Sequence, residues 1–335
     1  MLLLKQAPIT QLAECHLYTV EVRGSNPCWE HTKRKKNTTH MSKQTIKLKS
    51  LTVLPEEMFR IGTLNLWSHP YRLTERLTKL SDELETLKFD IIAIQEINHA
   101  HKEEIVEAFV SLGFTEYFVN EPTTLPDGTQ YGTAIFSKPF GVTYTPVAQF
   151  VEGSPALPVN AIHASIPYNN TVIHLLNAHL SWGSANEWVR VRQAELLDTY
   201  VKELETHYPE DAFILVGDLN ATQETSTLRY LKGLQESPAS HRGTLWVDAW
   251  DIHGHEGNFI TSDPDSVSGA TTAAIVGLPK ADLIIKRRID YILSYGWCYG
   301  KQGYPLNFHR FTDTQQDPEI SDHFGLWSDI YIPVK

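Results

Sequence analysis

The fold is decided by a stretch of seven residues, Asp90–Glu96, which reads DIIAIQE. Its apolar run is continuous and does not alternate, which is typical of a strand at the centre of a sheet that is covered on both faces. The stretch ends in two polar residues, Gln95 and Glu96. A similar stretch, Phe59–Leu66, precedes it and carries Asn65 near its end. The sequence therefore predicts covered strands whose ends bear polar side chains.

A helical period separates these two strands. Leucines recur at positions 73, 77, 80, 84 and 87, and this spacing places them on one face of an amphipathic helix. Further strands are expected at residues 115–119, 131–137, 142–151, 159–166, 171–178, 212–216, 289–294, 305–311 and 324–332, and further helices at 105–112, 184–204 and 224–233. Short turns join the strands between residues 131 and 178, so we expect mixed sheets with helices packed outside them, an α/β sandwich.

The composition is that of a folded protein without a membrane-spanning helix. The chain has 335 residues, of which 41% are hydrophobic and 21% are charged. It has no run of the roughly 18 apolar residues that a spanning helix requires. Its three cysteines, Cys15, Cys28 and Cys298, give neither a disulfide framework nor a zinc pattern. We therefore expect a reducing, cytoplasmic location and a monomer.

Charge is distributed unevenly along the chain. Residues 1–50 hold nine basic and three acidic residues, whereas the remainder holds 20 basic and 37 acidic ones, a balance of −17. A body this acidic repels polyanions at long range, so tight duplex binding through a broad basic face is disfavoured. Clustered carboxylates are, however, the ligands that bind hard divalent cations.

The first 57 residues differ from the rest and are expected to form a poorly ordered leader. Residues 11–27 resemble the conceptual translation of a transfer-RNA gene, so we hypothesise that translation begins at Met41 or Met58 and that residues 1–40 are not part of the protein. The alternative is that the basic cluster Lys33–Lys36 belongs to an arm that binds nucleic acid. Residues 58–335 are expected to form one domain.

Polar residues at the ends of strands are the chemical signal in this sequence. They comprise Asn65, Glu96, His179, Asp218, Asn220, Asp290, Asp322 and His323. Each has an ordinary explanation by itself, such as a turn residue, a core histidine or a partner for Arg287 or Arg288. Side chains at strand ends can nevertheless converge on one crevice. Oxygen ligands there would hold Mg²⁺, His and Asp would move protons, and amides would hold phosphate oxygens.

Six motifs together resemble the endonuclease/exonuclease/phosphatase superfamily, the group of deoxyribonuclease I. The motifs are Thr63–Leu66, Ile94–Glu96, Asn177–Leu180, Gly217–Asn220, Arg288–Tyr291 and Ser321–His323. They occur in the family's order and cover roughly residues 58–332. The resemblance implies a four-layer α/β sandwich, with two packed mixed β-sheets flanked by helices. It also implies a hydrolase of phosphoric esters.

The resemblance implies a role for each polar residue on the metal side of the site. Glu96 would be the main Mg²⁺ ligand, with Asn65 beside it and Asp322 in the same cluster. Mn²⁺ is an alternative to Mg²⁺. Asp218 would orient or deprotonate the attacking water, and Asn220 would bind a phosphate oxygen.

It also implies two histidines that face the scissile phosphate. His323 would contact the phosphate and be held by Asp290, and His179 would lie opposite and be held by Glu121. Which group acts as base, which as acid, and whether one metal or two is bound stay open at this point. Arg190 and Gln193 either reach the crevice or lie on a solvated helix face.

Three functions compete. The first is a nuclease, in which aromatic and basic residues of the segment 236–288 either contact the nucleic acid or form a partly buried loop. The second is a phosphoesterase that acts on a small or lipid phosphoester, as sphingomyelinases and inositol phosphatases do. The third is an inactive domain that binds a partner. The completeness of the catalytic set favours an enzyme, and we expect a phosphodiester as its substrate.

Overall fold

The strands form two sheets in the computed structural model. It describes residues 53–124, 128–149, 159–237, 244–275, 286–296, 302–313 and 316–334. The predictions made for residues 1–52 lie outside this part of the chain, and the unit from Pro55 onward is the one described here. Among the described helices, none has the length and apolar character needed to cross a bilayer.

The first sheet has the two central strands of the sequence at its middle. Strands β1 (Met58–Asn65) and β2 (Ile91–Asn98) pair in parallel, and the other pairs in the sheet are antiparallel. The order is β12-β14-β1-β2-β5-β3, with β13 beside β14 and β4 beside β5. The remaining strands are β3 (Glu116–Val119), β4 (Thr123–Thr124), β5 (Gln130–Ser137), β12 (Tyr304–Pro305), β13 (His309–Phe311) and β14 (Gly325–Tyr331).

The second sheet has a parallel pair at its middle as well. Strands β8 (Thr171–His179) and β9 (Ala212–Asp218) run parallel, and their neighbours are antiparallel. The order is β10-β11-β9-β8-β7-β6. The remaining strands are β6 (Thr143–Gln149), β7 (Val159–Tyr168), β10 (Trp246–Asp248) and β11 (Asp290–Tyr295).

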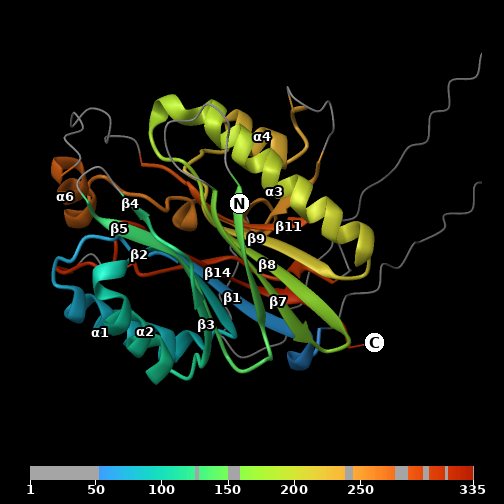
Figure 1. Cartoon of the computed structure of the whole chain (residues 1–335), viewed down its shortest axis with the longest axis horizontal. Coiled ribbons are helices and arrows are strands. Elements are labelled where there is room, and N and C mark those ends of the chain that lie inside the picture. Colours follow the sequence, from blue (N-terminus) through green and yellow to red (C-terminus); the bar gives the residue numbers. More distant parts are fainter. Residues whose placement is uncertain are drawn as a thin grey trace, which may run out of the picture. The chain divides into compact units, whose positions relative to one another are not determined.

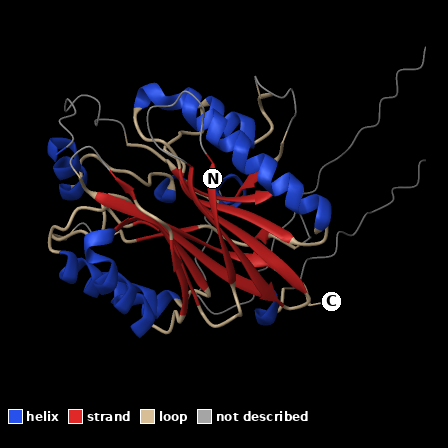
Figure 2. Ribbon diagram, viewed as in Figure 1, coloured by secondary structure: helices blue, strands red, loops and turns tan. Residues whose placement is uncertain are grey.

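Helices cover the outer face of each sheet (Figures 1 and 2). Helices α1 (Leu73–Leu87) and α2 (Lys102–Ser111) pack on the first sheet. Helices α3 (Glu187–His207) and α4 (Ser226–Leu231) pack on the second. Shorter helices are α5 (Ala249–His253), α6 (Val267–Ile275) and the 3-10 turns η1 (Pro55–Glu57), η2 (His99–His101), η3 (Ser184–Asn186) and η4 (Glu256–Asn258).

Three apolar layers hold these four layers of structure together. One lies between the sheets, and one lies between each sheet and its helices. Residues of β2 show the alternation that this requires, because Ile91 and Ala93 contact the central layer and Ile92 and Ile94 contact the helices. The predicted four-layer α/β sandwich is therefore confirmed.

The composition of segment 236–288 predicts a turn-rich stretch between the helix at 224–233 and the strand at 289–294, but its described part contains more regular structure than that. It carries the strand β10 and the helices α5 and α6. These elements have 3, 5 and 9 residues, which is too short for a hydrophobic period to predict them.

A buried pair of amides links the two sheets. Gln95 Nε2 on β2 donates to Asn177 Oδ1 on β8 at 2.7 Å and to Thr63 Oγ1 at 3.0 Å. Asn177 Nδ2 in turn donates to the carbonyl oxygens of Ile94 and Ala134 in the first sheet, at 2.9 and 2.8 Å. Because Gln95 and Asn177 are fully buried, these bonds fix how one sheet lies over the other.

We expect Asn177→Ala to destabilise the fold. The substitution leaves Gln95 Nε2 and two carbonyl oxygens without their shared partner, and each buried group left unsatisfied costs about 1–3 kcal/mol. The free energy of unfolding in urea should fall by at least about 2 kcal/mol. The control is Gln130→Ala, which removes an exposed amide and should change that free energy by less than about 0.5 kcal/mol. Equal effects of the two substitutions would contradict the inter-sheet role.

Candidate active site

Strand register brings the predicted site residues to one edge of both sheets. In the first sheet, Asn65 at the end of β1 pairs with Gln95 on β2. In the second, Asp218 at the end of β9 pairs with His179 on one side and with Asp290 on the other. The carboxyl ends of parallel strands meet at the same sheet edge, which explains why positions far apart in sequence become neighbours.

Glu96 owes its direction to an irregularity in β2. The pairing of β2 with β5 shifts register between Ile94 and Ile97, and Glu96 has a φ of +58°. In a regular strand the side chain after Gln95 would point into the apolar layer beneath the helices. The bulge makes Glu96 an extra residue and turns its carboxylate to the sheet edge, at the cost of a left-handed backbone conformation.

Three acidic and amide side chains meet directly. Asn65 Nδ2 donates to Glu96 Oε1 and to Asp218 Oδ2, at 3.1 Å each, and Asn65 Oδ1 accepts from the backbone N–H of Trp67 at 3.0 Å. The other oxygen of Glu96 accepts from Ser68 N at 3.1 Å. Asn65 thus presents its nitrogen to the carboxylates, and it fits a positioning role better than that of an oxygen ligand.

Both predicted histidines face this cluster. His179 Nε2 lies 3.6 Å from Asp218 Oδ2 and 3.9 Å from Glu96 Oε1. His323 Nε2, on the loop before β14, lies 3.9 Å from the same Asp218 oxygen. Burial raises the pKa of Glu96, but the charge of His179 and the hydrogen bonds from Asn65 and Ser68 outweigh it, so the pKa falls below its ordinary value.

His323 is held by a carboxylate, as expected. Its Nδ1 lies 2.9 Å from Asp290 Oδ2, and both side chains are buried. Burial lowers the pKa of His323, but the carboxylates of Asp290, Asp218 and Asp322 raise it well above its ordinary value. These carboxylates therefore favour the protonated form of the imidazole.

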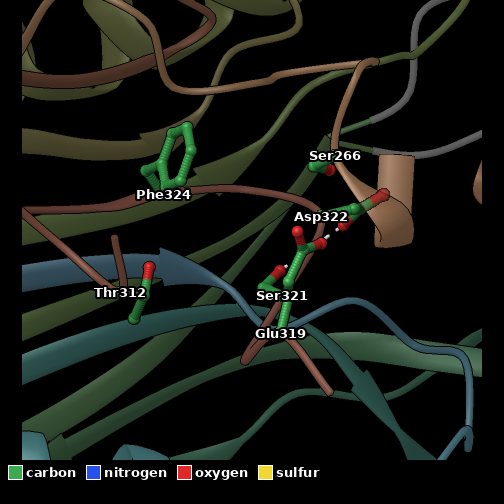
Figure 3. A pocket seen from close by; sticks show the side chains of 6 residues that line it. All are labelled: Ser266, Thr312, Glu319, Ser321, Asp322 and Phe324. Carbon is green, nitrogen blue, oxygen red and sulfur yellow. Dashed lines mark hydrogen bonds between the residues drawn. The ribbon is translucent and has the colours of Figure 1, made fainter. Parts of the chain in front are cut away.

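Asp322 lies on the loop before β14. Its carboxylate accepts from Thr272 Oγ1 at 2.8 Å, and Ser321 Oγ donates to the backbone oxygen of Asn65 at 2.6 Å. Partial removal from water, together with the charge of Glu96, raises the pKa of Asp322 to about 6 against the opposing charge of His323. Figure 3 shows Ser321 and Asp322 on one side of a small pocket and Phe324 on the other.

The remaining predicted residues have mixed outcomes. Asn220 joins the site, since its N–H donates to Asp218 Oδ1 at 2.8 Å and its Nδ2 donates to Leu180 O at 3.0 Å. Glu121 is exposed. Among the described side chains, the carboxylates that pair with His179 are those of Glu96 and Asp218. The structure therefore does not place Glu121 where the orienting role expected for it requires.

Sequence reasoning missed Arg76, which holds two of the site loops. Its fully buried guanidinium donates to the carbonyl oxygens of Leu66, Trp67 and His69 on one loop and of Ile320 on another. Burial lowers its pKa to about 10, against the charges of Asp322 and Glu96 that raise it. The signal was available, because position 76 falls three residues after Leu73 on the apolar face of α1.

Arg190 and Gln193 also prove structural. Both are buried and bind the backbone of residues 181–183, as detailed below, so the solvated helix face that was one alternative is wrong. In the described part of segment 236–288, Trp246 is buried, and Arg288 pairs with buried Asp248 at 2.7 Å and lies over the ring of Trp250. These contacts favour the partly buried loop over an exposed patch that contacts nucleic acid.

The donor set fits a hard divalent cation. Glu96, Asp218 and Asp322 crowd one sheet edge, and such crowding is unfavourable unless cations neutralise it. The charge of Arg76 offsets part of this repulsion, but its hydrogen bonds go to backbone oxygens and not to the carboxylates. Glu96 and Asp322 are the residues that would hold the cation, and carboxylate oxygens are its preferred ligands.

A second grouping is acid–base in character. One donor atom from each of Asp218, Asp290 and His323 lies within 4.8 Å of the others, which meets a geometric criterion for a metal site. Asp290 Oδ2, however, is already engaged by His323 Nδ1. We therefore interpret this trio as a proton-handling unit next to the cation ligands, and the geometry suits the hydrolysis of a charged ester.

Solved structures share this fold. TDP2 from D. rerio, complexed with single strand DNA product, has 18% identity and a TM-score of 0.60, over 82% of this chain and 98% of that one. Truncated TDP2 from Caenorhabditis elegans has 16% identity and a TM-score of 0.58, over 82% and 97%. The human Nocturnin catalytic domain with bound sulfate anion has 15% identity and a TM-score of 0.57, over 84% and 96%.

Sequence comparison gives the family. No curated protein matches the chain by sequence. The model of the Endonuclease/Exonuclease/phosphatase family matches residues 62–323, a span that contains the strand-end residues from Asn65 to His323. With the fold and the clustered acidic and histidine side chains in agreement, the chain belongs to the Endonuclease/Exonuclease/phosphatase family.

Proposed function

We propose that this protein is a Mg²⁺-dependent hydrolase of phosphodiester bonds and that its substrate is nucleic acid. One observation carries the proposal: Asp218 Oδ2 lies between two imidazoles, 3.6 Å from His179 and 3.9 Å from His323, and is tied through Asn65 to Glu96. This arrangement provides a base, an acid and a cation ligand within one crevice.

Asp218 is the group best placed to receive the proton of the attacking water. It is buried, and its Oδ1 is fixed by Asn220 N, so that Oδ2 faces the histidines. An oriented carboxylate can align a water for attack on phosphorus and accept its proton as the new P–O bond forms.

His323 is the candidate proton donor. With its pKa raised by Asp290 and the neighbouring carboxylates in spite of burial, it would carry a proton near neutral pH. It would stabilise charge on the phosphoryl oxygens and pass its Nε2 proton to the leaving oxygen as that P–O bond breaks. His179 would stabilise the phosphate from the other side.

Glu96 and Asp322 would hold the cation. A bound Mg²⁺, or Mn²⁺ in its place, supplies Lewis-acid neutralisation of the phosphate charge. Asn65 would keep Glu96 and Asp218 apart and oriented through its amide nitrogen. The exposed position of Glu121 does not support the orienting role towards His179 that the resemblance implies.

Nucleic acid is favoured over a small phosphoester, which is the second candidate. The D. rerio TDP2 structure contains a single strand DNA product, and that supports the first. The −17 balance of residues 51–335 disfavours polyanions and supports the second. An assay with single-stranded DNA, duplex DNA, RNA, sphingomyelin and inositol phosphates, each with Mg²⁺ and with EDTA, decides between them. Absence of Mg²⁺-dependent hydrolysis of every diester would favour an inactive binding domain.

Glu96→Gln and His323→Asn should abolish catalysis without unfolding the protein. Each removes a charge on which the reaction depends, and we expect kcat for bis-p-nitrophenyl phosphate with Mg²⁺ to fall by at least about 100-fold. Thermal unfolding in EDTA should stay close to wild type. Glu85→Gln, an exposed Glu on α1, is the matched control and should retain full activity. The site assignment fails if both site variants keep most of their activity.

Arg76→Lys should raise the Mg²⁺ requirement. One ammonium cannot reach carbonyl oxygens on both loops as the guanidinium does, so Asp322 and the Ser68 N–H that binds Glu96 would no longer be held in place. We expect the Mg²⁺ concentration for half-maximal activity to rise at least about tenfold, the cost of roughly 1.4 kcal/mol in ligand positioning. Arg72→Lys, at an exposed ion pair beside the same helix, is the control. A lower melting temperature with an unchanged Mg²⁺ requirement would show that Arg76 is merely structural.

A further inference from the structure

Two tryptophans next to the site are left in water. Trp182 and Trp188 are 46% and 50% exposed. The other tryptophans that the structure describes are buried or half-buried, namely Trp67, Trp246, Trp250 and Trp327. Exposure of a large apolar ring forgoes the free energy that burial would release. Two such rings within one short segment, which begins three residues beyond His179, indicate a contact surface.

The backbone that carries Trp182 is held on every side. Arg190 Nη1 donates to Ser181 O at 2.9 Å and to Gly183 O at 2.8 Å. Ser181 N donates to Gln193 Oε1 at 2.9 Å, and Trp182 O accepts from Asn186 Nδ2 at 2.6 Å. The loop is thus fixed before any ligand arrives, so the indole can bind without a further cost of ordering the backbone.

This loop is continuous with the catalytic residues. Leu180 N donates to Asp218 O at 2.9 Å, and Leu180 O accepts from Asn220 Nδ2 at 3.0 Å. Trp182 therefore lies two residues after Leu180, whose backbone is hydrogen-bonded to Asp218 and Asn220. Three residues span at most about 10 Å, so Trp182 lies no farther than this along the chain from His179, and a base next to a phosphate at His179 is within its reach.

The net charge of the protein indicates which part of a nucleic acid the Trp182 ring would contact. The acidic body offers little attraction to a string of phosphates, so a nucleic acid must gain affinity elsewhere. Stacking of a base on an aromatic ring does not depend on charge and is open to unpaired bases of any sequence. In a duplex the base faces are already stacked on one another and would have to be extruded first.

We propose that Trp182 stacks on an unpaired base beside the scissile phosphate and thereby gives the enzyme a preference for single-stranded nucleic acid. The inference rests on the proposed function and extends it from the reacting atoms to the neighbouring base. Affinity for a single strand should then depend on Trp182 and only weakly on salt, because few phosphate contacts release counterions.

The test is binding of a fluorescently labelled thymidine hexanucleotide in EDTA, followed by anisotropy, so that no hydrolysis occurs. Trp182→Ala should weaken binding by about 5- to 150-fold, the range to which a stacking contribution of about 1–3 kcal/mol converts. Trp182→Phe should retain most of the affinity. Wild type should bind an abasic hexamer as poorly as the alanine variant binds the thymidine hexamer. The control is Tyr208→Ala, since Tyr208 is 52% exposed and lies about 30 Å along α3 from its start, and its affinity should equal that of wild type.

Three results would overturn the inference: no binding of the hexamer by wild type, equal affinity of wild type and Trp182→Ala, or duplex bound as tightly as single strand. A shift of tryptophan emission to shorter wavelength with sphingomyelin vesicles that is lost in Trp182→Ala, without hexamer binding, would point to a lipid surface and also overturn it. Hydrolysis of bis-p-nitrophenyl phosphate by wild type with Mg²⁺ is measured separately. If wild type hydrolyses bis-p-nitrophenyl phosphate but any of the overturning results is found, the stacking inference fails and the proposed function stands. If Trp182-dependent binding is found without this hydrolysis, the proposed function alone is rejected.

Discussion

The contact between Gln95 and Asn177 is the constraint on which the site depends. Apolar layers can hold two sheets together, but they are non-directional and set no unique offset between them. The amide pair does so, because three buried hydrogen bonds cross the interface: Gln95 Nε2 donates to Asn177 Oδ1, and Asn177 Nδ2 donates to Ile94 O and Ala134 O. Glu96 follows Gln95 directly, and His179 lies two residues after Asn177. The bonds that align the sheets therefore also set the distance between the two halves of the active site.

Several carboxylates lie close together in the site that this contact aligns. Asp322 lies close enough to Glu96 for their charges to interact, Asn65 links Glu96 to Asp218, and Asp290 faces Asp218. Each carboxylate raises the free energy of its charged neighbours. Two imidazoles offset part of this negative charge. Arg76 contributes its charge but directs its hydrogen bonds at backbone oxygens, so a bound cation would neutralise the remainder. The same negative charge that favours a bound cation also raises the pKa of His323. In the proposed mechanism, cation binding and proton donation by His323 would therefore have one electrostatic origin.

Much of this was predictable, and the exceptions have physical reasons. Continuous apolar runs that end in polar residues predicted the central strands, and their order predicted which side chains converge. The bulge at Glu96 was not predictable, because periodicity identifies a strand and not a register shift within it. The contribution of Arg76 depends on two loops that meet only in the folded chain. Glu121 was placed beside His179 by resemblance alone, and the fold leaves its side chain exposed.

The loop after β8 shows how specificity can be built without altering the chemistry. Arg190 Nη1 donates to the carbonyl oxygens of Ser181 and Gly183, and Gln193 Oε1 accepts from Ser181 N. An exposed turn does not need these hydrogen bonds from buried side chains, because water could satisfy its backbone groups. They are appropriate if the position of one exposed side chain matters. For an acidic protein, the proposed stacking on Trp182 would bind a polyanion more effectively than another lysine, because stacking is not weakened by the field of the whole molecule.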